Sequence, residues 1–274
     1  MTYREICARL TEAGIENADH DAALLVEHFC NIPFSTVPLD PDRNYDSPRL
    51  SNAVEQRATR YPLQYILGEW WFYRQVYEVS PDCLIPRSDT EILVEEAIRL
   101  LPKNATFADL CTGSGCIAVS VLAERPDTRA VALDLFPKTL AVAARNAAKN
   151  GVQGRFTPIC DNVLTPTCTE KTPIFDAILS NPPYIRSAVL NELLPELSAE
   201  PVAALDGGED GLIFYRQILS HFAERLAPSG FFLFEIGFDQ ADDVLALGQA
   251  HGFSNGRVLR DLGGRDRVVF LSRG

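Results

Sequence analysis

The first part of the chain spaces its apolar residues as an amphipathic helix does. From Tyr3 to about Gly68 they recur three and four residues apart, which gathers them on one helix face. Ser47 followed by Pro48 is typical of a helix start, whereas residues 33–45 lack periodicity and predict a loop. A small helical domain is therefore expected. Its periodic positions are Ile6, Leu10, Ile15, Leu24, Leu25, His28, Phe29, Leu50, Val54 and Ala58.

The pattern changes at Trp70, where aromatic and β-branched residues take over. Between Trp70 and Val79 these residues predict a short β-hairpin that joins two domains. We place the boundary near residue 80. Residues 1–80 are then a helical domain with the linking hairpin, and residues 81–274 form a second, larger domain.

The rest of the chain alternates short apolar runs with helical stretches, which predicts an α/β fold. The expected architecture is a Rossmann-like, mostly parallel sheet with helices on both faces. Because Pro158 cannot donate a backbone hydrogen bond, its strand is expected at a sheet edge. The predicted strands are Thr106–Leu110, Ala130–Asp134, Phe156–Ile159, Phe175–Ser180, Phe231–Ile236 and Val268–Leu271. The predicted helices are Cys116–Arg125, Pro137–Asn150, Leu212–Leu226 and Asp239–His251.

Composition and charge narrow the class of protein. Of the 274 residues, 46% are hydrophobic and 23% are charged, which excludes a fibrous or disordered chain. No run approaches the roughly 20 apolar residues of a membrane span, and charge comes too early for a signal peptide. We therefore expect a soluble, cytoplasmic protein. The net charge of -12 counts against a dedicated nucleic-acid binder.

The cysteines indicate neither a disulfide framework nor a zinc site. There are 7 of them, they are scattered along the chain, and none forms a Cys-x-x-Cys pair. We expect reduced, mostly buried thiols. The 4 histidines lie outside every motif described below, so packing or surface roles are expected for them.

The first candidate ligand site follows the first strand of the predicted sheet. The segment Cys111-Thr112-Gly113-Ser114-Gly115 leads into a helix at Cys116, and its glycines let the backbone approach a ligand at the helix N-terminus. Asp134 closes the next strand, where a carboxylate can accept both hydroxyls of an adenosine ribose. A nucleotide-like ligand is predicted, but this pattern does not separate NAD from S-adenosyl-L-methionine.

The second candidate site is the loop Asn181-Pro182-Pro183-Tyr184, which follows the fourth predicted strand. Two successive prolines remove backbone donors and stiffen the loop. The side-chain oxygen of Asn181 and the carbonyl of Pro182 can then both face outward as fixed acceptors. Such a pair suits a substrate NH2 group whose nitrogen is aimed at a methyl donor, with Tyr184 packed on the flat group.

For two further pairs of residues the sequence leaves the role open between ligand binding and local structure. Asp161 and Asn162 follow the third strand, where they either meet an adenine ring or simply form a turn. Arg87 and Glu91 either orient the donor's polar tail or support the helix that begins near Thr90. We favour the structural role for the second pair, because a polar residue before Glu is typical of a helix start.

These motifs together resemble a known family. The glycine loop, Asp134 and the Asn-Pro-Pro-Tyr loop look like a class I S-adenosyl-L-methionine-dependent methyltransferase acting on a planar NH2, and the tetrapeptide is shared with DNA adenine-N6 methyltransferases. Further segments are similar to the release-factor glutamine N5-methyltransferases, the PrmC/HemK family, over nearly the whole chain. They are Tyr61–Gly68, Leu84–Glu91, Glu200–Leu212, Glu235–Gly237 and Asp261–Arg267.

The resemblance implies a substrate and a set of site residues. The substrate would be the glutamine of a Gly-Gly-Gln loop in a peptide chain release factor, methylated on its amide nitrogen, with residues 1–80 docking the factor. Cys111 stands where the family usually has glycine, and Ser88-Asp89 replaces a common Pro-Glu. The donor would contact Cys111, Thr112, Gly113, Ser114, Gly115, Asp134, Asn162 and Asn181. The glutamine would contact Asn181, Pro182, Pro183 and Tyr184, of which Asn181, Pro182 and Tyr184 would serve catalysis.

Rival functions remain. An adenine-N6 methyltransferase acting on DNA or RNA shares the core motifs, but the acidic charge disfavours it. A nicotinamide-dependent oxidoreductase leaves the Asn-Pro-Pro-Tyr loop unexplained, and a non-catalytic nucleotide binder is disfavoured further. For the favoured reaction no general base and no metal is needed, because the methylated nitrogen becomes acidic enough to lose its proton to solvent. We expect a monomer without membrane contact.

Overall fold

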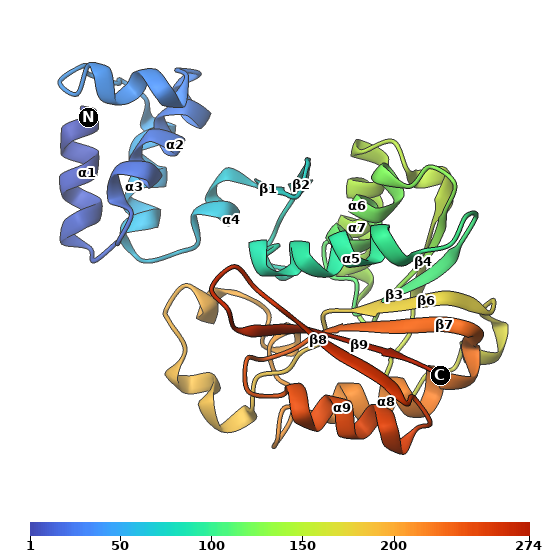
Figure 1. The fold of residues 1–274 in the computed structure, drawn as a ribbon. Coiled ribbons are helices and arrows are strands. Elements are labelled where there is room, and N and C mark those ends of the chain that lie inside the picture. The colour runs from blue at the N-terminus through green and yellow to red at the C-terminus, as the bar shows by residue number, and fades with distance from the viewer. The chain divides into compact units, whose positions relative to one another are not determined.

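The computed structural model describes residues 1–274, which divide into two compact units (Figure 1). The helical unit comprises Met1–Glu69 and Leu194–Ala199, and the sheet unit comprises Trp70–Leu193 and Glu200–Gly274. The hairpin β1 (Glu69–Phe72) and β2 (Gln75–Glu78) thus falls almost entirely in the sheet unit. The sequence pattern had grouped it with the helices, but Phe72 and Tyr77 of the hairpin are buried in the core of the sheet unit.

The helical unit is built from amphipathic helices that begin at capping residues. Thr2 and Glu5 form a reciprocal capping box at the first helix. Ser47 accepts from the Leu50 amide at 3.2 Å, and Pro48 occupies the first turn, as the sequence predicts. The expected loop at 33–45 contains a 3-10 turn, η1 (Phe34–Leu39). The four helices are α1 (Tyr3–Glu12), α2 (Ala18–Cys30), α3 (Pro48–Ala58) and α4 (Leu63–Leu67).

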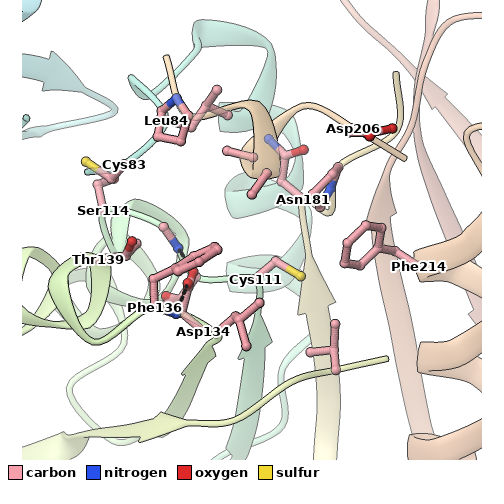
Figure 2. A pocket seen from close by; sticks show the side chains of 18 of the residues that line it. Cys83, Leu84, Cys111, Ser114, Asp134, Phe136, Thr139, Asn181, Asp206 and Phe214 are labelled. Atoms are coloured by element: carbon pink, nitrogen blue, oxygen red, sulfur yellow. Dashed lines mark hydrogen bonds between the residues drawn. The ribbon is translucent and has the colours of Figure 1, made fainter. Parts of the chain in front are cut away.

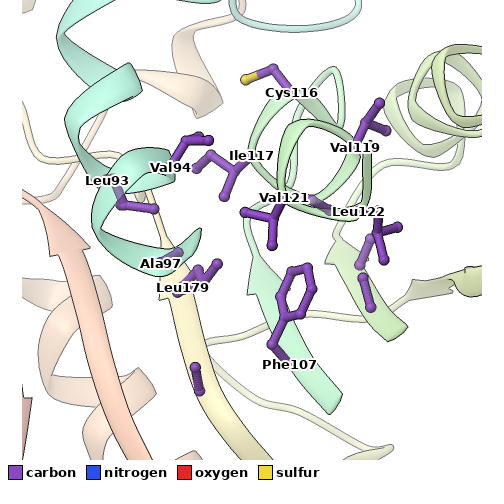
Figure 3. Close-up of a cluster of buried hydrophobic side chains, with 14 of the residues drawn as sticks. Leu93, Val94, Ala97, Phe107, Cys116, Ile117, Val119, Val121, Leu122 and Leu179 are labelled. Carbon is purple, nitrogen blue, oxygen red and sulfur yellow. The ribbon is translucent and has the colours of Figure 1, made fainter. Parts of the chain in front are cut away.

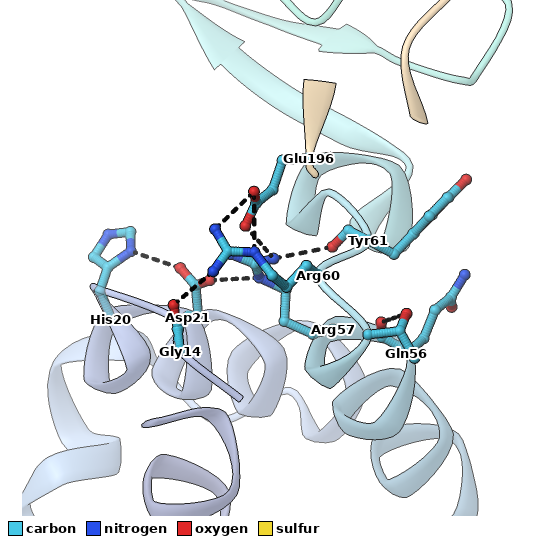
Figure 4. A network of polar contacts seen from close by, with 9 residues as sticks. Gly14, His20, Asp21, Gln56, Arg57, Arg60, Tyr61 and Glu196 are labelled. Atoms are coloured by element: carbon cyan, nitrogen blue, oxygen red, sulfur yellow. Dashed lines mark hydrogen bonds and ion pairs between the residues drawn. The ribbon is translucent and has the colours of Figure 1, made fainter. Parts of the chain in front are cut away.

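A network of ion pairs attaches a distant segment to this helical unit (Figure 4). Arg57 donates to Asp21 at 2.8 Å, and both side chains are nearly buried. Arg60 donates to Glu196 at 2.9 Å, and Arg57 lies 3.5 Å from the same carboxylate. Glu196 therefore fixes the segment Leu194–Ala199 to helix α3 and the residues after it.

The sheet unit is organised around seven strands in the order β5-β4-β3-β6-β7-β9-β8. Five strands run parallel, and β9 pairs antiparallel with both β7 and β8. The strand that contains Pro158 lies at an edge, as predicted. The strands are β3 (Thr106–Leu110), β4 (Arg129–Asp134), β5 (Phe156–Cys160), β6 (Phe175–Ser180), β7 (Leu226–Glu235), β8 (Asn255–Arg260) and β9 (Asp266–Ser272).

Helices cover both faces of the sheet, which confirms the predicted architecture (Figure 1). On one face, Leu93, Ile117 and Val121 pack over Phe107 and Leu179 of the central strands (Figure 3). The opposite face carries a second apolar cluster. The first face is covered by α5 (Glu91–Leu100), α6 (Cys116–Glu124) and α7 (Pro137–Lys149), and the second by α8 (Ile213–Phe222) and α9 (Ala241–Ala250).

Two strand predictions need correction. No strand was expected at Asn255–Arg260, yet β8 lies there as the second sheet edge. Its residues are mostly exposed and begin Asn-Gly-Arg, so they carry no alternation of apolar and polar positions. Strand β7 begins at Leu226 rather than Phe231. Leu226 pairs with Phe175 of β6, whereas pairing with β9 begins only at Phe231, so Pro228 and Gly230 lie where β7 has no partner on β9.

The cysteine prediction is partly wrong. All seven thiols are free, but only Cys83 and Cys116 are buried, while Cys160 is exposed and the others are half-buried. No three His, Cys, Asp or Glu side chains in residues 1–274 are placed to share a metal ion. None of the helices combines the length and the apolar character needed to cross a bilayer.

Substitution at Phe232 tests the second cluster. Its ring is fully buried, stacks on Phe234 at 5.3 Å and meets the edge of Phe253 at 5.1 Å. Phe232→Ala should lower the free energy of unfolding by about 3–5 kcal/mol, because it leaves a cavity. Phe238→Ala is the matched control, since that ring is 65% exposed, and should change stability by less than about 0.5 kcal/mol. Equal denaturation midpoints for the two variants would contradict this packing.

Candidate active site

A cavity of about 380 Å³ opens at the carboxyl ends of β3, β4 and β6 (Figure 2). This edge is where ligands bind in open parallel sheets. Its lining includes most of the residues predicted from the sequence, namely Cys111, Thr112, Gly113, Ser114, Asp134, Asn162, Asn181 and Pro183. Gly115, Pro182 and Tyr184 are not among the lining residues. The sequence did not single out the apolar part of the wall, which includes Leu84, Leu135, Phe136, Val163 and Phe214.

The glycine loop is held in shape by its backbone conformation and by one carboxylate. Gly113 has a φ of +56°, in the left-handed region, and a Cβ built on it meets no atom within 4 Å. Its amide donates to Asp134 at 3.0 Å. Cys111 also has a left-handed φ of 60°, although it carries a Cβ. The side of the loop at Gly113 is therefore open enough for a ligand to approach the backbone.

Asp134 lies at the end of β4 with its carboxylate at the cavity wall (Figure 2). One oxygen accepts from the Gly113 amide and the other from the Phe136 amide at 3.1 Å. Burial raises the pKa of this carboxyl. Each carboxylate oxygen can accept more than one hydrogen bond, so Asp134 retains capacity for ligand hydroxyls.

Asp109 is a buried acid that the sequence analysis did not place in the site. One of its oxygens accepts from the Thr112 hydroxyl at 2.6 Å and from the Ala118 amide at 3.1 Å. The other is buried without a partner, and burial raises the pKa of Asp109 to about 7. The sequence did carry a signal for this residue, because Asp109 is an acid inside the apolar strand Thr106–Leu110. Its contacts with Thr112 and Ala118 tie the glycine loop to helix α6.

Asn181 presents a free acceptor beside the cavity. Its Nδ2 donates to the Thr90 hydroxyl at 3.2 Å. Its Oδ1 is buried and has no hydrogen-bond partner. A buried polar atom without a partner is rare and costs about 1–3 kcal/mol. This oxygen is therefore available to a donor group supplied by a ligand.

The backbone around Tyr184 is braced by a segment more than 20 residues downstream. Ile185 donates to the Leu205 carbonyl at 2.9 Å, and Gly207 donates to the Ile185 carbonyl at 2.8 Å. Gln240 donates to the Tyr184 carbonyl at 3.0 Å. Burial raises the pKa of the Tyr184 phenol to about 12, so its hydroxyl stays neutral. The ring packs beside the second apolar cluster instead of lining the cavity.

The structure shows which contacts are made by the two pairs of residues whose roles the sequence left open. Glu91 accepts from the Tyr73 amide at 2.8 Å, which ties the hairpin to helix α5. Arg87 lines the cavity and forms an ion pair with Glu200. Asp161 and Asn162 both form turn hydrogen bonds, to the Thr167 and Leu164 amides, and both also line the cavity.

The fold and the cavity together define a class I S-adenosyl-L-methionine-dependent methyltransferase. The sheet has the strand order β5-β4-β3-β6-β7-β9-β8 with an antiparallel β9. The glycine loop after β3 lines the cavity at the carboxyl ends of its strands. A methyltransferase from Pyrococcus furiosus shares this fold, with a TM-score of 0.55 and 15% identity, covering 72% of this chain and 88% of that chain.

The chain belongs to the release factor glutamine methyltransferase family. Residues 2–68 match the model described as PrmC N-terminal domain, and residues 88–219 match the methyltransferase small domain. The release factor glutamine methyltransferase of Cereibacter sphaeroides is 42% identical, covering 97% of this chain and 95% of that protein. That of Caulobacter vibrioides is 37% identical, covering 95% and 91%.

Gly211 tests how the loop at Tyr184 is braced. A Cβ there would stand 2.5 Å from the Tyr184 carbonyl and 2.6 Å from Gln240. Gly211→Ala should therefore displace the loop and lower the methyl-transfer rate on the order of 10- to 100-fold.

Gly252→Ala is the matched control, because Gly252 has a similar φ of +83° and no atom within 4 Å of the added carbon. Both variants should lose about 1–2 kcal/mol from left-handed strain, but only Gly211→Ala should slow transfer. Equal rates in the two variants would refute the bracing role.

Proposed function

We propose that this protein transfers a methyl group from S-adenosyl-L-methionine to the N5 amide nitrogen of a glutamine. The substrate is the glutamine of the Gly-Gly-Gln loop in peptide chain release factors, so the modification modulates translation termination. The observation that carries the proposal is the buried, unpartnered Oδ1 of Asn181 beside the cavity. It is an acceptor that lacks a donor, and a primary amide supplies such a donor.

The cavity suits the methyl donor in size and chemistry. Its volume of about 380 Å³ falls within the range of roughly 300–1,000 Å³ typical of small-molecule sites. Asp134 would accept the ribose hydroxyls, and Asn162 would lie near the adenine. Residues 111–115 would approach the rest of the donor with their backbone, where Gly113 leaves open space. When bound, S-adenosyl-L-methionine supplies a methyl group that its sulfonium has already activated.

The protein's contribution to the reaction is positioning. An amide nitrogen is a poor nucleophile, because its lone pair is delocalised into the carbonyl. Asn181 Oδ1 and the Pro182 carbonyl would each accept one N–H of the glutamine, which favours positive charge on the nitrogen as it is methylated. Tyr184 supports this loop through its packing. The methylated nitrogen then releases its proton to solvent.

The helical unit is the proposed docking element for the release factor. A cavity that holds one side chain offers little area, whereas a specific protein complex buries about 800 Å² on each partner. Residues 1–69 supply the further contact surface that a protein substrate needs, whereas the Asn181 loop alone is too small to do so. Since release factors act in translation, we place the reaction in the cytoplasm.

Mass spectrometry of a methylated substrate tests the proposed function. Purified release factor, incubated with the enzyme and S-adenosyl-L-methionine, should gain one methyl group on the glutamine of its Gly-Gly-Gln loop. Asn181→Ala should lower kcat and kcat/KM together by on the order of 100-fold, because the acceptor acts mainly in the transition state.

Three outcomes would count against this proposal. If a labelled methyl group of the donor entered DNA or RNA and not the release factor, the result would favour an adenine-N6 methyltransferase. A raised KM with unchanged kcat would make Asn181 a ground-state anchor. A severe loss in Tyr184→Phe, which keeps the ring, would mean that the hydroxyl takes part, contrary to the packing role.

Asp134→Ala tests the donor site. The substitution removes the carboxylate at the end of β4, so affinity for S-adenosyl-L-methionine should fall by about 1.5–3 kcal/mol, the scale of hydrogen bonds to a charged group. Calorimetric titration measures the change. Asp242→Ala removes a carboxylate from helix α9, away from the cavity lining, and should leave affinity unchanged. Unaltered binding by Asp134→Ala would exclude the ribose role.

A further inference from the structure

A buried carboxylate stands behind the Asn181 loop. Glu235 ends strand β7, and the pairing of Ser180 with Phe234 places it beside Asn181 in the next row of the sheet. It is 1% exposed. The Thr90 and Asn181 side chains lie close enough to its carboxylate to lower its pKa, against the larger, raising effect of burial, and its Oε2 has no hydrogen-bond partner. The sequence analysis assigned Glu235 no role, and the reaction described above does not use it directly.

The partners of Asn181 determine which end of its amide faces the cavity. The oxygen and the NH2 group of an asparagine amide are nearly equal in size, so hydrogen bonds decide their placement. The NH2 group donates to Thr90 at 3.2 Å, and the strand register places Glu235 next to Asn181. A carboxylate only accepts hydrogen bonds. It therefore attracts the NH2 group and leaves Oδ1 as the free acceptor.

We propose that Glu235, together with Thr90, is a positioning residue that keeps the Oδ1 atom of Asn181 turned toward the substrate amide. This inference rests on the proposed function. If the amide of Asn181 were reversed, its NH2 group would meet the NH2 group of the glutamine, and two donors repel. Glu235 thus acts through Asn181 and does not touch the substrate.

The charges around Glu235 make this orientation sensitive to pH. Burial raises the pKa of Glu235 to about 7. Above that pH the carboxylate can only accept a hydrogen bond, and below it the protonated acid can itself donate one. Arg267 favours the charged form and is shared with Asp89 and Asp261 at 3.2 Å. The other titratable groups near Glu235 are Tyr184, Tyr215 and Cys116.

Kinetics of two substitutions test the orientation. Glu235→Gln keeps the shape but offers both a donor and an acceptor, so kcat should fall about 10- to 100-fold, as when a partner that orients a functional ligand is lost. The loss of activity as pH falls through about 7 should disappear. Thr90→Val should lower kcat, and Thr90→Ser should restore it, because serine keeps the hydroxyl. Glu78→Gln, on a surface carboxylate paired with Arg145, is the control and should keep both rate and pH profile.

A nuclear magnetic resonance titration separates this inference from the proposed function. The side-chain amide signal of Asn181 in the 15N-labelled enzyme, assigned by its absence in Asn181→Asp, should move with pH near 7. It should not move in Glu235→Gln. This measurement needs no substrate, so it decides the inference even if release factor is not methylated. Wild-type kcat and pH profile in Glu235→Gln, or a signal of Asn181 that ignores pH, would overturn it.

Discussion

The parallel register of β3 with its two neighbours is the constraint on which the site depends. Leu110 pairs with Leu133 on one side and with Ser180 on the other. The residues that follow, Cys111, Asp134 and Asn181, consequently leave the sheet at the same level. Hydrogen bonds at the strand ends hold this register, since Ser180 donates to the Leu110 carbonyl at 2.6 Å and Thr112 donates to the Leu133 carbonyl at 3.0 Å. A shift of one residue between β3 and β4 would separate the glycine loop from the carboxylate of Asp134.

This dependence explains how much the sequence predicts. Buried parallel strands are apolar runs with clear ends, so β3 and β6 were predicted with the bounds that the structure has. The residues after each strand end follow directly in the sequence, which is why most of the predicted site residues line the cavity. Edge strand β8 was missed because solvent on its exposed side removes the apolar pattern. Sequence pattern is strongest where burial is deepest.

Contacts between distant segments leave no such signal. Glu196 is held by Arg57 and Arg60, which lie more than 130 residues earlier, and no local spacing announces that pairing. The closeness of Gly211 to the Tyr184 carbonyl likewise depends on two loops that meet only in the fold. Such contacts are set by tertiary packing, so the attachment of Leu194–Ala199 to the helical unit and the bracing of the Asn181 loop emerged only from the structure.

Buried polar atoms without a hydrogen-bond partner also gather toward the carboxyl ends of the central strands. Asp109, Asn181 and Glu235 each have one buried oxygen without a partner, and they belong to β3, the loop after β6, and β7. Each such atom costs about 1–3 kcal/mol relative to a paired one. Three such atoms on or directly after neighbouring strands are hard to reconcile with a purely structural role, because apolar residues would pack there without this cost. Of the three, Asn181 lines the cavity, so a donor group of a bound ligand can satisfy its free oxygen, and binding should then recover part of the free energy that folding leaves unrealised.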